Sequence, residues 1–271
     1  MVFGRSWVKT LGWRRHTAFL ALTVLTWACV AEDKLPQTNL GNNGDPVQHH
    51  RFPSAVKVLI SGDVCSGVNF GTFVVTAAHC LFDAKQPEKK QVALSSEIKI
   101  VLSNSSTPIS IKSFVVAPQY DAQNESRNHD LAKLYVDNGA LGSVSRAELA
   151  PVPQVGDPVT VVGWGATYFS ESAVYTDLGI LRTGKNRVFE VGEHFITIKG
   201  PHQKSSGVDQ TITFPGDSGG PLLDSSGRVI GILSHGELFK DYKVSRYTSL
   251  HARCNRAFID SQVCAGAGGK R

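Results

Sequence analysis

Ser218 is the residue of this sequence best placed to act as a nucleophile, because it lies in the glycine-rich stretch Gly216-Asp-Ser-Gly-Gly-Pro221. A serine hydroxyl is a weak nucleophile at neutral pH, so it needs a base within hydrogen-bond reach and donors for the oxyanion that it creates. The flanking glycines allow a tight turn in which backbone N–H groups can point at one spot. The stretch therefore makes Ser218 a candidate nucleophile, and the plainer alternative is a surface turn that contains a serine.

Two other segments offer a base and an acid. His79 ends the run Thr76-Ala-Ala-His-Cys80, and a local disulfide at the adjacent cysteine would fix the backbone of the histidine. Asp130 begins the alternating apolar segment within 128–134, where a buried carboxylate would need hydrogen bonds. Taken alone, the histidine could be structural and the aspartate could cap a loop. Together with a serine, they supply the residue types of a catalytic triad.

Short β-type segments must position these residues. They are rich in Val, Ile and Thr and are separated by Gly, Asn, Asp and Pro, which indicates an all-β sandwich or barrel. A helical pattern occurs only at 253–263, where Phe258 and Ile259 could dock. The segments predicted as strands are Ala55–Ile60, Thr72–Thr76, Glu97–Leu102, Ile109–Val116, Val159–Gly163, Phe195–Lys199 and Val229–Ser234.

The charge distribution argues against a nucleic-acid partner. The 271 residues have room for one large domain or two small ones, and the net charge is +5. Four basic residues precede the first acidic residue, Glu32, so the remaining chain carries only +1. The basic character therefore belongs to the N-terminus and gives no electrostatic support for nucleic-acid binding.

The N-terminus is typical of an export signal. A basic segment ending at Arg15 precedes the apolar run Thr17–Ala28, which is shorter than the roughly 18–20 residues that a membrane-spanning helix needs. Cleavage after Ala31 would give a signal peptide over residues 1–31. Alternatively, a degenerate lipoprotein signal would end at residue 28, with Cys29 acylated as the only membrane attachment. We expect a secreted or extracytoplasmic protein, in the periplasm or cell envelope if bacterial.

Three further segments follow in the predicted organisation. Residues 32–46 are polar and turn-rich and form a linker or pro-segment, residues 47–262 form the folded domain, and residues 263–271 form a flexible tail. Outside the leader there are four cysteines, an even number that suits an oxidising compartment. Because no CxxC spacing occurs, we expect no structural zinc, and nothing in the sequence calls for another metal or a cofactor.

The order His79, Asp130 and Ser218 on an all-β chain resembles the trypsin-like (chymotrypsin-fold) serine proteases. The resemblance covers about residues 46 to 262 and implies two six-stranded antiparallel β-barrels followed by a short C-terminal helix. Further motifs that agree in order and spacing are Phe114-Val-Val-Ala-Pro-Gln-Tyr120, Gly163-Trp-Gly165, Gly231-Ile-Leu-Ser-His-Gly236 and Tyr247-Thr248.

The resemblance also implies a role for each catalytic residue. Ser218 would attack the scissile carbonyl, His79 would accept and return its proton, and Asp130 would orient the imidazole. The N–H groups of Gly216 and Ser218 would form the oxyanion hole. A monomeric endopeptidase acting on polypeptides follows, with a protein inhibitor as a further partner. The alternative is a catalytically impaired pseudoprotease that binds partners through the same scaffold.

The substrate-binding residues depart from the family pattern. Ser234 and Gly236 would pair with the main chain of an extended substrate, and His235 stands where the family usually has tryptophan. Ile212 occupies the base of the specificity pocket and offers no charge to a basic side chain. Phe214 replaces a cysteine, so the disulfide that braces the pocket is missing. Cleavage after apolar or small residues is expected.

The activation segment and one disulfide also depart from the family pattern. In the family, Asp217 would pair with a freed N-terminal ammonium, but the segment Leu40–Val47 lacks the usual Ile-Val pair. Either another protease trims this segment or the aspartate finds a different partner. The resemblance pairs Cys65 with Cys80. It leaves Cys254 and Cys264, which ten residues of straight helix would separate by about 15 Å. The helix must end early for them to pair, or the thiols stay free.

Overall fold

The computed structural model describes residues 45–46, 51–82, 93–123, 127–142, 144–166, 168–169, 175–176, 178–201 and 210–264. The polypeptide divides into two units, Met1–Leu35 and Pro36–Arg271, and every described residue belongs to the second. The predicted signal peptide, Cys29, residues 32–44 and the tail after Cys264 lie outside the described residues. Within the described part of the chain, no helix has the length and apolarity needed to span a bilayer.

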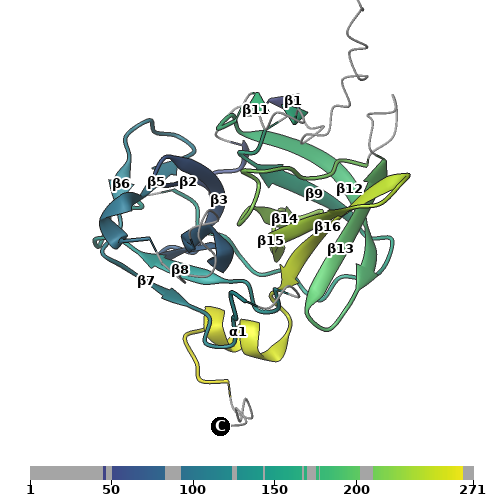
Figure 1. The fold of residues 1–271 in the computed structure, drawn as a ribbon. Coiled ribbons are helices and arrows are strands. Elements are labelled where there is room, and N and C mark those ends of the chain that lie inside the picture. The colour runs from purple at the N-terminus through teal and green to yellow at the C-terminus, as the bar shows by residue number, and fades with distance from the viewer. Residues whose placement is uncertain are drawn as a thin grey trace, which may run out of the picture. The chain divides into compact units, whose positions relative to one another are not determined.

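Two seven-stranded antiparallel sheets make up the described fold (Figure 1). The first has the order β6 (Ile109–Ser110), β5 (Ile98–Leu102), β2 (Ala55–Ile60), β3 (Asp63–Asn69), β4 (Phe73–Thr76), β8 (Ala132–Tyr135) and β7 (Ser113–Val116). The second has the order β1 (Asp45–Pro46), β12 (Arg182–Val191), β13 (Phe195–Pro201), β16 (Tyr242–Ser249), β15 (Val229–Leu238), β14 (Pro221–Leu223) and β9 (Pro158–Gly163). A separate hairpin joins β10 (Tyr168–Phe169) and β11 (Tyr175–Thr176).

The two sheets close in different ways. In the second sheet, β12 pairs with both β13 and β9, so six strands form a closed barrel with β1 added outside it. The ladders of the first sheet leave it open. Its edge strands β6 and β7 are nevertheless consecutive in the chain, separated only by Ile111 and Lys112, so the backbone itself connects the two edges. The predicted all-β architecture is confirmed, with one closed barrel and one open one.

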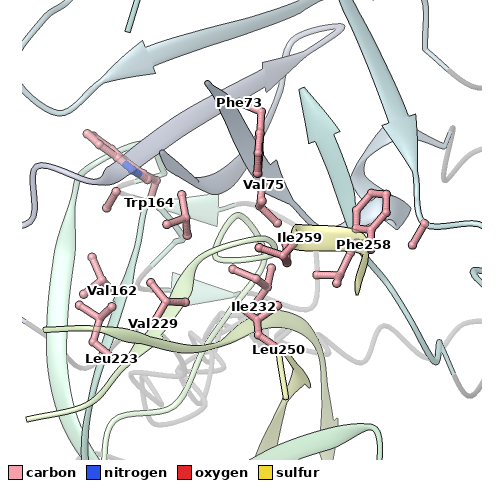
Figure 2. Close-up of a cluster of buried hydrophobic side chains, with 14 of the residues drawn as sticks. Phe73, Val75, Val162, Trp164, Leu223, Val229, Ile232, Leu250, Phe258 and Ile259 are labelled. Carbon is pink, nitrogen blue, oxygen red and sulfur yellow. The ribbon is translucent and has the colours of Figure 1, made fainter. Parts of the chain in front are cut away.

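A buried apolar cluster lies between the two sheets (Figure 2). Phe73 and Val75 contribute from β4, Val162 from β9, and Ile232 from β15. Burial of each large apolar side chain contributes about 1.5–3 kcal/mol to folding. Because residues of both sheets share this cluster, separating the sheets would expose it to water. The cluster therefore fixes the sheets against each other. The loops that the two sheets carry at their junction are held in fixed relative positions as a result.

The C-terminal helix α1 (Arg253–Ile259) covers one end of this cluster, where Phe258 is buried as predicted. The helix ends about one turn earlier than its sequence pattern suggests. Ser261 then adopts a positive φ of 58°, and the chain turns back. Cys254 and Cys264 form a disulfide with Cα atoms 5.0 Å apart. The condition for pairing these two cysteines, an early helix end, is thus met.

Lys133 ties the helix to the first sheet. This residue of β8 is only 2% exposed, and its ammonium lies 4.2 Å from the ring centroid of Phe73 and 5.1 Å from that of Phe258. The same nitrogen donates a hydrogen bond of 2.8 Å to Ser261 Oγ. The aliphatic stem therefore fills core volume while the charged end meets two aromatic rings and a hydroxyl.

We predict that Lys133→Ala lowers the free energy of unfolding by about 2–4 kcal/mol, because it leaves a cavity and removes these contacts. Urea unfolding followed by tryptophan fluorescence measures the change. Lys112→Ala is the matched control, since its ion pair with Asp137 is exposed, with side chains 61% and 71% accessible. It should cost less than about 0.5 kcal/mol. Equal losses in the two variants would contradict a docking role for Lys133.

Candidate active site

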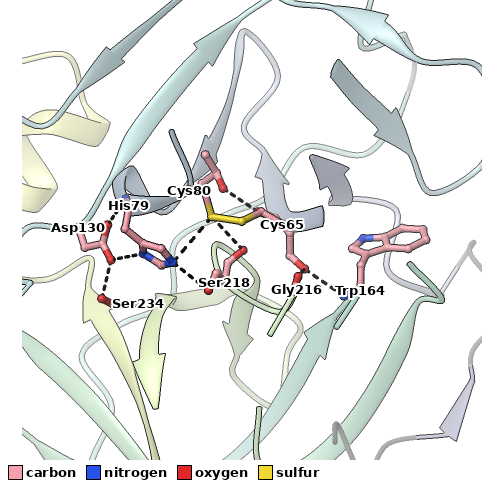
Figure 3. Close-up of a disulfide and its surroundings, with 10 residues drawn as sticks. Cys65, His79, Cys80, Asp130, Trp164, Gly216, Ser218 and Ser234 are labelled. Atoms are coloured by element: carbon pink, nitrogen blue, oxygen red, sulfur yellow. Dashed lines mark hydrogen bonds and ion pairs between the residues drawn. A yellow bond between two sulfur atoms is a disulfide. The ribbon is translucent and has the colours of Figure 1, made fainter. Parts of the chain in front are cut away.

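Residues from three separate segments meet at the junction of the two sheets (Figure 3). His79 lies in the 3₁₀ turn η2 (Ala78–Leu81) directly after β4, Asp130 precedes β8, and Ser218 lies in the loop before β14. The distance from His79 Nδ1 to Asp130 Oδ2 is 2.7 Å, and His79 Nε2 lies 3.0 Å from Ser218 Oγ. The structure therefore brings together all three residues selected from the sequence.

The carboxylate of Asp130 is completely buried and fully engaged in hydrogen bonds. Its Oδ1 accepts a bond of 2.8 Å from the backbone N–H of His79, and its Oδ2 accepts one of 2.6 Å from Ser234 Oγ in addition to the imidazole contact. Burial by itself would raise the pKa of Asp130. The charge of His79 and the hydrogen bonds from His79 and Ser234 outweigh burial and hold this pKa below its usual value. Asp130 is therefore an anion at neutral pH.

The helix α1 helps to place the loop that carries Asp130. His129, the preceding residue, has a positive φ of 59°, and its Nδ1 lies 2.6 Å from Asn255 Oδ1. Asn255 is 1% exposed, and its Nδ2 donates a hydrogen bond of 2.8 Å to the carbonyl of Ser249. An uncommon backbone conformation next to the acid is thus held by a buried side-chain contact.

A disulfide fixes the turn that carries His79. Cys65 in β3 is bonded to Cys80 in η2, with Cα atoms 6.5 Å apart, which confirms the predicted pair. Because Cys80 directly follows His79, the bridge ties the imidazole to the sheet.

Ser66 connects the first sheet to the loop Gly216–Gly220, called the nucleophile loop here because it carries the predicted nucleophile Ser218. Its N–H donates a hydrogen bond of 2.7 Å to the carbonyl of Ser218, and its Oγ donates one of 2.9 Å to the carbonyl of Gly216. The same Oγ accepts a bond of 3.0 Å from the N–H of Trp164. Ser66 is 1% exposed, so these bonds are protected from water. One buried residue therefore holds both ends of the Gly216–Ser218 segment.

Two glycines of the nucleophile loop have backbone conformations that other residues rarely adopt. Gly216 has a φ of 96° and Gly219 has a φ of 84°. A Cβ at Gly219 would collide with the carbonyl oxygen of Ser66 and with Thr76 Oγ1, and a Cβ at Gly216 would lie 2.9 Å from the Cα of Gly165. Glycine is therefore required at both positions by conformation and by space.

Asp217, which directly precedes Ser218, is a second buried carboxylate and is 1% exposed. Its oxygens accept hydrogen bonds of 2.8 Å from Gly165 N–H and 2.9 Å from Phe214 N–H. Burial raises the pKa of Asp217 to about 6, although these two bonds and the charges of Lys243 and Arg182 oppose the rise. Asp217 therefore has hydrogen-bond partners within the chain. Trimming of the Leu40–Val47 segment by another protease stays a prediction.

The predicted substrate-binding residues border this loop. Ile212 is fully buried. The side chain of Ser234 bonds Asp130, a contact that the sequence did not predict, and Gly236 pairs with Ser245 of β16. His235 Nδ1 lies 3.0 Å from Ser234 Oγ, and burial, followed by the charge of Arg127, lowers the pKa of this histidine.

The sequence matches the family model described as Trypsin over residues 42–255. The chain belongs to the trypsin family. The solved structures similar to this trypsin-family protein include neuropsin, a serine protease expressed in the limbic system of mouse brain. It is 22% identical, with 81% of this chain and 98% of the neuropsin chain covered at a TM-score of 0.59. A Glu endopeptidase in complex with MPD is 13% identical, with coverages of 82% and 97% and a TM-score of 0.62.

Identities this low show that the fold is shared and no more. A search of curated proteins finds no match. Within the described residues, no group of three or more His, Cys, Asp or Glu side chains could hold a metal ion.

Three residues around the site were not selected from the sequence. Ser66 and Asn255 position the loops, and Lys243 lies beside Asp217. A serine directly after a cysteine and an asparagine in a short helix are common, so neither stands out in one sequence. Lys243 lies in the stretch Lys240-Asp-Tyr-Lys-Val-Ser-Arg246, where charged residues are frequent, so it does not stand out either. Only the three-dimensional contacts identify these residues.

We predict that Ser234→Ala lowers kcat about 10- to 100-fold, because Asp130 loses a hydrogen bond to a buried charge, worth about 1.5–3 kcal/mol. Peptide hydrolysis by purified protein measures the effect. Ser225→Ala, at an exposed turn, is the control and should retain wild-type kcat. A Ser234→Ala variant with wild-type turnover would show that this bond is unimportant.

The raised pKa of Asp217 predicts a pH-dependent contribution to stability. Because the folded-state pKa of about 6 exceeds the ordinary 3.8, the contribution of this group is fully present below about pH 4 and is lost as the pH rises through 6. Relative to Asp217→Asn, the wild type should therefore gain about 2 kcal/mol of unfolding free energy between about pH 7.5 and pH 4. Urea unfolding of both proteins at the two pH values measures this difference. A loss of unfolding free energy on going to pH 4, relative to Asp217→Asn, would contradict the raised pKa of Asp217.

Proposed function

We propose that this trypsin-family protein is an exported serine endopeptidase that hydrolyses peptide bonds through an acyl-enzyme. The observation that carries the proposal is the continuous hydrogen-bonded chain from Ser218 through His79 to the buried carboxylate of Asp130, with distances of 3.0 and 2.7 Å. This order of nucleophile, base and acid is the arrangement that activates a serine hydroxyl. No observation favours the pseudoprotease alternative.

In the proposed mechanism, Ser218 Oγ attacks the scissile carbonyl while its proton passes to His79 Nε2. The imidazolium that forms is stabilised by Asp130, which stays ionised because of the hydrogen bonds that it accepts. His79 then gives the proton to the leaving amine, and the acyl-enzyme remains on Ser218. A water molecule, deprotonated by the same imidazole, hydrolyses this ester. The side chain of His79 is 22% accessible, so the base can exchange its proton at the surface.

The backbone N–H groups of Gly216 and Ser218 are the proposed oxyanion donors. Within the described residues, neither of these two N–H groups has a hydrogen-bond acceptor, so both are available to a substrate. Ser66 holds the carbonyls of the same two residues on the side of the first sheet. An oxyanion donor of this kind is worth roughly 2.7–4 kcal/mol of transition-state stabilisation.

The outer half of β15 is the proposed binding edge for the substrate main chain. β14 pairs with β15 only at its beginning, up to Ile232, whereas β16 pairs along the strand as far as Leu238. From Ser234 to Gly236, the edge opposite β16 therefore has no partner strand within the described residues. An extended polypeptide, either a substrate or a protein inhibitor, can add there as an antiparallel strand.

Export agrees with the family and with the disulfides. Trypsin-like proteases are commonly secreted, and two disulfides suggest an extracellular protein. We propose that residues 1–31 are removed after Ala31, or that processing before Cys29 yields a lipid-anchored protein, and that the mature enzyme acts as a monomer. N-terminal sequencing and detergent partitioning of the mature protein distinguish the two processing routes.

We predict that Ser218→Ala reduces peptide hydrolysis by at least about 10⁴-fold, because no other group can form the acyl-enzyme. Labelling by a fluorophosphonate should be lost in parallel, while the urea midpoint stays within error of the wild type. Ser225→Ala, which also removes one serine hydroxyl near β14, should label and turn over normally. Undiminished turnover by Ser218→Ala would contradict the proposed role of Ser218 as the nucleophile.

A further inference from the structure

The side chain of Lys243 fills the space beside Gly236, a residue that the sequence predicts to bind substrate. In β16, Lys243 and Ser245 are two residues apart and therefore lie on one face of the strand. Ser245 pairs with Gly236 of β15. A Cβ placed on Gly236 would lie 2.7 Å from Lys243 Cε and 3.4 Å from its Nζ. The lysine side chain thus runs across the face of Gly236, in the strand that leads away from Ser234.

The far wall of this space is the segment before the nucleophile. The ammonium of Lys243 donates a hydrogen bond to the carbonyl of Thr213 and lies 3.8 Å from the ring centroid of Phe214. Thr213 Oγ1 and N–H both reach Ser245 Oγ, at 2.8 and 3.2 Å. The charged end therefore lies between β15, β16 and the Thr213–Phe214 segment. This is the place assigned to the specificity pocket, and it also receives hydroxyl groups from two walls.

The ammonium group of Lys243 has N–H donors that its bond to Thr213 does not use. Lys243 is only 8% exposed, and within the described residues no carboxylate lies within 4.0 Å of its nitrogen. The neighbouring carboxylate of Asp217 is engaged by two backbone N–H groups. An ammonium has three N–H donors, and the bond to Thr213 uses one of them. A buried cation with no carboxylate in direct contact is costly unless a ligand supplies one.

We infer that Lys243 makes this protease selective for an acidic side chain at P1, the residue whose carbonyl is attacked. A Glu or Asp carboxylate entering past Gly236 would satisfy the open donors of the ammonium, and the Thr213 and Ser245 hydroxyls could add hydrogen bonds. A basic P1 side chain would be repelled, and a large apolar one would have to displace Lys243 from Thr213. This inference rests on the proposed function and replaces the apolar preference based on Ile212.

The test uses the full-length protein and peptides that differ only at P1, which is Glu, Gln, Ala, Phe or Arg. Fluorophosphonate labelling is measured first, because it reports the nucleophile independently of P1. We expect kcat/KM for the Glu peptide to exceed that for the isosteric Gln peptide at least about tenfold. Labelling without this preference, or fastest cleavage after Ala, Phe or Arg, would overturn the inference and leave the proposed function intact. Absence of labelling would instead overturn the proposed function.

Lys243→Met then tests the residue itself, because methionine keeps an unbranched apolar stem and removes the charge. The Glu-to-Gln ratio of kcat/KM should fall about tenfold or more toward unity. Lys240→Met, which removes an exposed charge from the same hairpin, should leave this ratio unchanged. A preserved ratio in Lys243→Met would show that another group recognises the acid. The wild-type comparison of Glu with Gln stays decisive even if this variant fails to fold.

Discussion

The burial of the Asp130 carboxylate is the constraint on which the rest of the site depends. A charge without access to water persists only if donors surround it, and here the donors come from both sheets. His79 follows β4 of the first sheet, and Ser234 belongs to β15 of the second. The sheets must therefore be fixed relative to each other, and the shared apolar cluster around Phe73 and Ile232 does this. Non-directional packing thus provides the fixed frame in which directional hydrogen bonds can work.

Each loop of the site is fixed by one bond or a few hydrogen bonds to a neighbouring element. A disulfide holds His79, a buried asparagine holds the turn before Asp130, and Ser66 holds the nucleophile loop. Each of these contacts joins the loop to a neighbouring element of regular structure. This arrangement suits a site whose reacting atoms must stay within a fraction of an ångström of their working geometry.

The three residues that meet at the candidate site could be selected from the sequence, because the proposed chemistry requires particular residue types in recognisable local settings. The glycines around Ser218 and the cysteine beside His79 are such settings. Strands such as β2 were also predictable, because most of its apolar residues are buried. β12 was not predicted, because its exposed residues include Arg187 and Glu190. A barrel strand with one face in solvent has no continuous run of apolar residues. The contacts of Ser66, Asn255 and Lys243 could not be predicted, because each joins segments that lie far apart in the sequence.

The contacts of Ser66 make the loop around Ser218 depend on the folding of both sheets. Ser66 belongs to a strand of the first sheet, yet its bonds shape the loop that carries the nucleophile in the second. A chain in which only one sheet has formed would not bring His79, Asp130 and Ser218 together and would not fix the loop around Ser218. The proposed proteolytic activity would therefore arise only when both sheets have formed and packed together. A nascent or partly unfolded molecule would then not cleave neighbouring proteins.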